Sequence, residues 1–144
     1  MKKVFLLATL AISGLLSANA QVKNIVGEWR TVDDNTGAEL SIVNIYQADN
    51  GKYYGKIVSV LVPGEEDAVC IACEGEDKNK PVTGLVIIRD MVEKDGALTG
   101  GKVLDPDNGK FYYGKISYEN GKLKLRGSLD KRGFLGRTQY WIRK

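Results

Sequence analysis

The sequence contains no histidine and only two cysteines, Cys70 and Cys73, and this scarcity excludes several kinds of catalytic site. Without an imidazole the chain cannot build a Ser-His-Asp or Cys-His nucleophile system. Histidine-based metal sites are excluded for the same reason, and a site on the two cysteines would need two further ligands, from carboxylates of the same loop or from a second subunit. We therefore expect no metal site and no cofactor.

The sequence also lacks long apolar runs and blocks of like charge. Its longest apolar run, over 4–16, is shorter than the roughly 18 residues that a membrane-spanning helix needs. The formal net charge is +3, and Lys and Arg are interleaved with Asp and Glu after the first residues. We predict no membrane span, and the pattern argues against nucleic acid or an anionic membrane surface as the main partner.

The N-terminal segment has the features of an export signal. Lys2 and Lys3 precede the apolar run, and Ala18-Asn19-Ala20 forms a small-residue cleavage site before Gln21. The sequence thus predicts a signal peptide over 1–20 and a single domain over 21–144. No cysteine stands at the cleavage point to carry a lipid, so we expect a periplasmic or secreted bacterial protein that is not a lipoprotein.

The remaining chain is predicted to be all β. Turns that contain glycine, often preceded by Asp or Asn, separate segments rich in Val, Ile, Tyr and Trp with period-two alternation. One connection, over 62–83, is long, and the other six are short enough to make consecutive strands antiparallel neighbours. The eight predicted strands cover 26–33, 38–47, 52–61, 85–93, 97–104, 110–118, 121–129 and 134–143.

Alternation along these strands predicts that one face is buried. Leu123 and Leu125 oppose Lys122, Lys124 and Arg126, and in the second strand Leu40, Ile42, Asn44 and Tyr46 are predicted to share a side. An eight-stranded meander avoids open edges by closing into an up-and-down barrel. A two-sheet β-sandwich is the alternative.

The cysteine pair lies in the long connection, and its spacing is compatible with several roles. In an oxidising compartment two thiols this close readily form a disulfide. A redox role would need a thiolate of lowered pKa, whereas acidic neighbours raise the pKa of a thiol. These neighbours are Glu65, Glu66, Asp67, Glu74, Glu76 and Asp77. We therefore predict a structural disulfide between Cys70 and Cys73.

Aromatic and arginine side chains form the candidate binding set. Pockets for small molecules are usually apolar and aromatic with a few polar anchors, and an eight-stranded barrel either fills with side chains or holds one small ligand. The competing interpretation is that these residues pack the core, with Trp29 and Arg137 stacked as a cation–π pair. The candidate ligand-binding residues are Trp29, Tyr46, Tyr53, Tyr113, Arg126, Arg137 and Trp141.

Two resemblances bear on the fold. Gly27-x-Trp29 resembles the G-x-W motif of lipocalins, in which the tryptophan closes the barrel against an arginine of the last strand, and Arg137 and Arg143 are placed to supply it. Ordered motifs along the chain also resemble the exported bacterial family DUF2147, which implies a calycin-like barrel and no established activity. These motifs include Tyr54-Gly55-Lys56-Ile57, Cys70-x-x-Cys73-x-Gly75, Leu104-Asp105-Pro106 and Gly136-Arg137-Thr138-Gln139-x-Trp141.

Three functions from different classes are compatible with these features. The first is a non-catalytic exported barrel that binds a small apolar or amphipathic, lipid-like ligand. The second is a cell-envelope interaction or scaffold protein that acts through the acidic 62–83 loop. The third, which the sequence favours least, is an enzyme that uses carboxylates or the cysteine pair.

Overall fold

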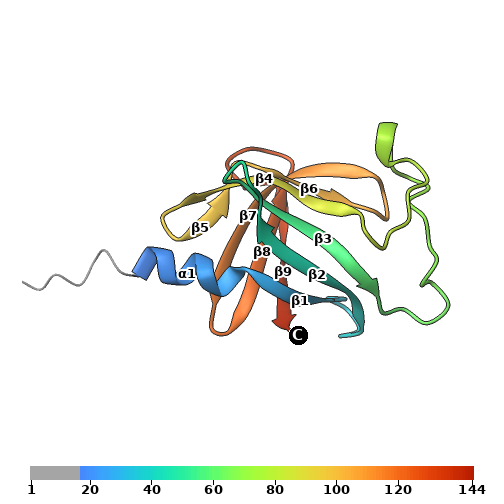
Figure 1. Cartoon of the computed structure of the whole chain (residues 1–144), viewed down its shortest axis with the longest axis horizontal. Helices are drawn as coiled ribbons and strands as arrows, with labels where there is room; N and C mark the ends of the chain where they lie inside the picture. Colours follow the sequence, from blue (N-terminus) through green and yellow to red (C-terminus); the bar gives the residue numbers. More distant parts are fainter. Residues whose placement is uncertain (1–16) are drawn as a thin grey trace, which may run out of the picture.

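The computed structural model describes residues 17–144 of the chain. Most of the predicted signal peptide, over 1–16, lies outside the described residues. Nine strands follow one helix, and Figure 1 shows them wrapped into a barrel with α1 at its left and the long green connection at its right. The elements are α1 Ser17–Ile25, β1 Gly27–Val32, β2 Glu39–Gln47, β3 Tyr53–Val60, β4 Val86–Lys94, β5 Ala97–Thr99, β6 Lys102–Asp105, β7 Lys110–Glu119, β8 Lys122–Ser128 and β9 Gly136–Arg143.

The strands form one closed antiparallel sheet. Consecutive strands pair along the chain, except that β5 and β6 both pair with β4 and β7, and β1 pairs with β9 through Trp29↔Arg143 and Arg30↔Ile142. This last pairing removes the open edges that a meander would otherwise expose. The structure therefore confirms the predicted eight-stranded barrel and not the sandwich.

The ninth strand arises because the strand predicted over 97–104 is interrupted. Its two parts, β5 and β6, both lie between β4 and β7. Gly100, at φ +78°, and Gly101 separate them, and a Cβ at Gly101 would overlap the Arg89 carbonyl. The chain thus bends at a point that only glycine can occupy.

The second strand departs from regular alternation. Thr31 of β1 pairs with Ser41 and Val32 pairs with Glu39, so Leu40 is an extra, bulged residue of β2, and Val43 and Ile45 beyond it are fully buried. Tyr46 therefore points out of the barrel and stacks on Tyr54, with 6.1 Å between ring centroids. The prediction that Tyr46 shares a side with Leu40 is wrong because a bulge exchanges the two faces of a strand.

Helix α1 closes one end of the barrel. It packs against β5 and β7, with Val22 and Ile25 buried. The predicted cleavage site lies within this helix, and residues 21–25 are helical although the sequence predicts only strands for the mature chain. We call the end covered by α1 and Trp29 the closed end.

Candidate ligand-binding cavity

The end of the barrel opposite α1 is hollow, and we call it the open end. In a meander alternate connections meet at one end, and here these are the β1–β2, β3–β4, β6–β7 and β8–β9 connections. They surround a cavity of about 1160 Å³ that extends between the strands. Its walls include Leu40, Ile57, Val60, Ile87, Val103, Leu125 and Trp141.

Three polar side chains, those of Thr31, Ser41 and Gln139, lie among these apolar walls. The hydroxyls of Thr31 and Ser41 hydrogen-bond each other across β1 and β2 at 2.7 Å. Gln139 lies on the cavity wall and accepts a hydrogen bond from the Trp141 indole N–H at 3.3 Å. These three residues give the cavity fixed polar positions on an otherwise apolar wall, which is the composition of a small-molecule site.

The rim of the cavity carries opposite charges. Arg137 on β9 faces Asp34 in the β1–β2 turn, with 3.6 Å between Nε and Oδ2, and both side chains are substantially exposed. Next to them, backbone N–H groups of Thr36 and Asn35 donate to Asp33 and hold the pKa of its carboxyl below the usual 3.8. The rim can therefore meet the polar end of a ligand whose apolar part lies among the strands.

The cysteines form the predicted disulfide within the long connection, and this segment packs on the β6–β7 turn of the barrel. Both sulfurs are buried, and Cys70 Sγ lies 3.5 Å from the Pro106 carbonyl in the β6–β7 turn. Gly109 of that turn packs so closely on Ala72 that a Cβ there would overlap its carbonyl. The disulfide thus holds the rim of the cavity, in addition to ordering the loop around it.

Trp29 belongs to the closed end and not to the cavity. It is fully buried, donates its indole N–H to the Ile25 carbonyl at 2.7 Å, and stacks under a guanidinium 3.9 Å from its ring centroid. That guanidinium is Arg143, which also donates to the carbonyls of Val26 and Asn24. The expectation that Arg137 makes this stack is wrong, because the pairing register brings Arg143 beside Trp29.

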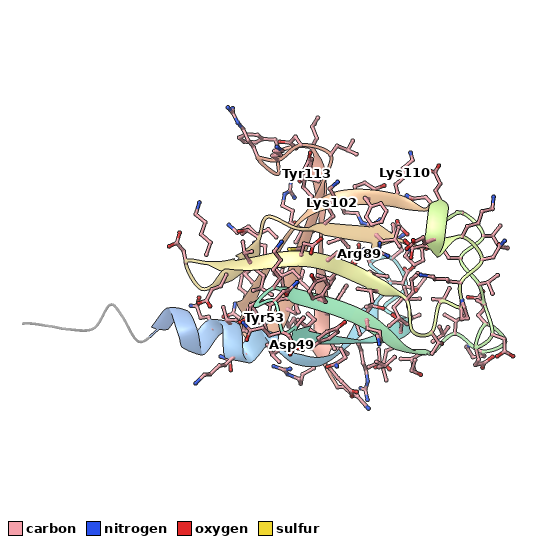
Figure 2. The ribbon with its side chains drawn as sticks, turned by 45° about the horizontal axis from the view of Figure 1, so that its top comes forward. Asp49, Tyr53, Arg89, Lys102, Lys110 and Tyr113 are labelled. Atoms are coloured by element: carbon pink, nitrogen blue, oxygen red, sulfur yellow. A yellow bond between two sulfur atoms is a disulfide. The ribbon has the colours of Figure 1, made fainter. Side chains whose placement is uncertain are left out.

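The other predicted site residues are dispersed. Tyr53 is buried in the core, and burial raises the pKa of its phenol. Tyr46 lies on the outer surface, as does Tyr113, which is labelled in Figure 2. Arg126 holds the β8–β9 loop through the carbonyls of Gly133 and Phe134. Of the seven predicted residues, Arg137 and Trp141 line the cavity.

Sequence reasoning missed the polar wall of Thr31, Ser41 and Gln139. Alternation places Thr31 on the same face as Trp29, so its inward direction was available as a signal. Ser41 was not placed, because the bulge at Leu40 interrupts the alternation beside it. Residues on strands that only barrel closure brings together cannot be grouped from the sequence of either strand.

The described part of the chain shows no cluster of three acidic or cysteine side chains that could hold a metal ion. In the acidic loop Asp77 is engaged by Arg89 at 2.9 Å and by Lys80 at 3.5 Å. Within residues 17–144 no helix is long and apolar enough to span a bilayer.

Comparisons with known proteins agree with this architecture. Residues 27–143 match the model of a family described as uncharacterized protein conserved in bacteria, DUF2147. The chain belongs to this family. No curated protein matches the sequence.

A solved structure is similar as well. HP1028 from the human pathogen Helicobacter pylori, which belongs to the lipocalin family, superposes with a TM-score of 0.71 at 26% identity. The match covers 83% of this chain and 82% of that one. The DUF2147 chain is therefore a lipocalin-like barrel, as the G-x-W motif and the Trp29–Arg143 stack indicate.

Proposed function

We propose that this DUF2147 protein is a non-catalytic carrier that binds a small amphipathic, lipid-like ligand in the open end of the barrel. The observation that supports this proposal is the cavity itself, about 1160 Å³ in volume, which combines apolar walls between the strands with polar and charged groups at its rim. Sites of this composition bury most of the surface of a small ligand, while a few polar groups fix its orientation. The similarity to a lipocalin structure supports the same proposal.

The distribution of polar groups favours an amphipathic ligand over a purely apolar one. Thr31, Ser41 and Gln139 lie on the wall, and Arg137 and Asp34 lie at the rim. A hydrocarbon alone would remove water from these groups without replacing their hydrogen bonds, which costs free energy. A ligand with a polar head and an apolar tail would match both parts of the cavity.

We further propose that the protein is exported, to the periplasm or outside the cell. The disulfide supports this location, because such bonds persist in oxidising compartments. The predicted signal peptide supports it independently, and N-terminal sequencing of protein purified from its host tests it. A first residue of Gln21 is expected, whereas an intact Met1 would contradict export by this route.

Filling the cavity tests the binding proposal. Val60 lines the cavity on β3, whereas Val58 of the same strand is 37% exposed and does not line it. In titrations with a dansyl-labelled fatty acid, Val60→Trp should weaken binding roughly tenfold or more, because an indole would occupy ligand volume. Val58→Trp is the matched control and should bind like the unmodified protein.

The outcomes of this experiment separate the candidate functions. Equal binding by the unmodified protein and by Val60→Trp would place the probe outside the cavity and contradict the proposal. If the unmodified protein binds no probe and no lipid extracted from its host, the partner-binding alternative through the 62–83 loop is favoured. Urea denaturation of both variants shows that any loss of binding occurs in folded protein.

A further inference from the structure

The β8–β9 loop, over 129–135, presents an apolar tip that the barrel does not use. Leu129, Phe134 and Leu135 are 67%, 76% and 67% exposed. Leu129 and Leu135 also lie at the rim of the cavity. Three large, exposed apolar side chains on one short loop form an apolar patch of the kind that marks an interaction site.

The loop is held rigidly in this conformation. The Asp130 carboxylate accepts backbone N–H groups of Leu135 at 2.8 Å and Phe134 at 3.2 Å. From the other side, Arg126 donates to the carbonyls of Gly133 at 2.6 Å and Phe134 at 3.3 Å. These bonds pair backbone groups of Gly133, Phe134 and Leu135, while the Phe134 and Leu135 side chains remain exposed. A loop with this construction can insert apolar groups without exposing unpaired backbone polar groups to a bilayer.

Basic residues surround the apolar tip. The segment 126–137 contains four basic residues and one acidic residue, Asp130. The outer face of the strands beneath the loop is also basic. In the strand register, Lys102 on β6 lies opposite Tyr113 on β7, and Lys115 on β7 lies opposite Arg126 on β8. Figure 2 shows the loop projecting at the top of the molecule, above the labelled Tyr113 and Lys102. The ion pairs found within residues 17–144 engage none of Lys102, Lys115, Lys131 and Arg132.

The cysteine loop provides an internal contrast. It also exposes a large apolar residue, Ile71, at 75%. However, the 61–85 segment contains six acidic and two basic residues. An anionic surface would repel this loop and attract the β8–β9 loop. The net charge of the whole chain argues against an anionic membrane surface as a partner, but it averages over two loops of opposite charge.

We propose that the β8–β9 loop and the basic wall beneath it dock the protein on the surface of an anionic phospholipid bilayer. Phe134 and Leu135 enter the headgroup region, and Lys131, Arg132, Lys102 and Lys115 face the lipid phosphates. Two terms contribute to the free energy with which a segment binds a membrane surface: the burial of apolar area and the attraction of basic residues to anionic lipid. The loop and the basic wall supply both. The inference does not depend on whether the cavity holds a ligand.

Vesicle flotation with the purified protein tests this proposal. The protein should float with phosphatidylglycerol–phosphatidylethanolamine vesicles and remain unbound with pure phosphatidylcholine vesicles. Phe134→Ser combined with Leu135→Ser should reduce partitioning at least roughly tenfold, because two apolar side chains no longer insert. Ile71→Ser is the matched control, since it removes an equally exposed apolar residue, and it should bind like the unmodified protein.

Charge reversal tests the electrostatic contribution separately. Lys131→Glu combined with Arg132→Glu should reduce partitioning roughly tenfold or more. Lys52→Glu combined with Lys56→Glu makes the same change in net charge on the exposed surface of β3 and the turn before it, away from the loop, and should have little effect. Binding of the unmodified protein should also weaken as salt is raised.

Several outcomes would overturn the proposal. Absence of flotation with anionic vesicles would do so, as would equal binding by the Phe134→Ser/Leu135→Ser variant. Equal losses in both charge-reversal variants would show attraction by net charge alone. If sedimentation instead reveals a dimer that the Phe134→Ser/Leu135→Ser variant dissociates, without any vesicle binding, the loop contacts a second copy of the chain.

Discussion

The two ends of this barrel are built from the same strands but differ in how they are filled. At the closed end Trp29, Ile45, Leu98 and Ile116 are fully buried, and α1 packs against β5 and β7. At the open end the strands diverge around a cavity whose rim is held by a disulfide, an ion pair and turns. The difference indicates that stability is concentrated at one end, which leaves the other free to bind.

The largest effect is expected from truncating the closed end. Trp29→Ala removes a fully buried indole, its hydrogen bond to Ile25 and the ring on which Arg143 stacks. We expect a loss of about 3–5 kcal/mol in the free energy of unfolding, measured by urea denaturation. A loss below about 1 kcal/mol would mean that the closed end is not the stabilising core.

Removing the disulfide should have a smaller effect, confined to the open end. Cys70→Ser combined with Cys73→Ser is expected to cost about 2 kcal/mol by the chain-entropy estimate for a short loop. Hydrogen exchange should increase over 61–85 and in the β6–β7 turn, because Cys70 and Ala72 contact that turn. Equal acceleration in α1 and β1 would instead show that the two ends are not independent.

Strand β9 carries Arg143 at the closed end and Arg137 at the open end, so the same substitution can be compared at the two ends. Arg143→Ala loses the stack on Trp29 and the hydrogen bonds to Val26 and Asn24, and we expect destabilisation of about 1–2 kcal/mol. Arg137→Ala loses an exposed ion pair with Asp34, for which about 0–1 kcal/mol is expected. Thermal unfolding of both variants measures the difference, and a reversed order would contradict the assignment of Arg143 to barrel closure.

The smallest expected effect concerns the pH dependence of the β8–β9 loop. Backbone N–H donation from Leu135 is the main cause that lowers the pKa of Asp130 below its ordinary 3.8. The ionised carboxylate therefore stabilises the loop at pH values above 3.8, and this contribution disappears as the pH falls through the lowered pKa. The Leu135 amide resonance should titrate with a midpoint below 3.8, and Asp130→Asn should abolish the titration. A midpoint at or above 3.8 would show that these hydrogen bonds do not form in solution.

Most of the fold could be predicted from local patterns. Turns such as Asn120-Gly121 and the alternation of Leu123 and Leu125 are local signals, and the structure confirms both. The exceptions arise from packing between strands. Gly100-Gly101 interrupts one strand, and the bulge at Leu40 separates that residue from the face of Tyr46, and each feature depends on packing that the sequence of a single strand does not display.

The candidate site was less predictable than the fold. Aromatic residues are equally suited to cores and to pockets, so composition could not separate Tyr53, which is buried in the core, from Trp141, which lines the cavity. Thr31 and Gln139 could not be grouped from the sequence, because only the closure of β1 on β9 brings their strands together. Closure also decided between Arg137 and Arg143 as the partner of Trp29.

The central claim is that the open end holds a small amphipathic ligand while the closed end is filled with side chains. Native mass spectrometry of the protein purified from its own host tests this claim most directly. We expect a bound small molecule on the unmodified protein and on Val58→Trp, and none on Val60→Trp. An unliganded mass for the unmodified protein under every growth condition, or the same bound mass on Val60→Trp, would contradict the account.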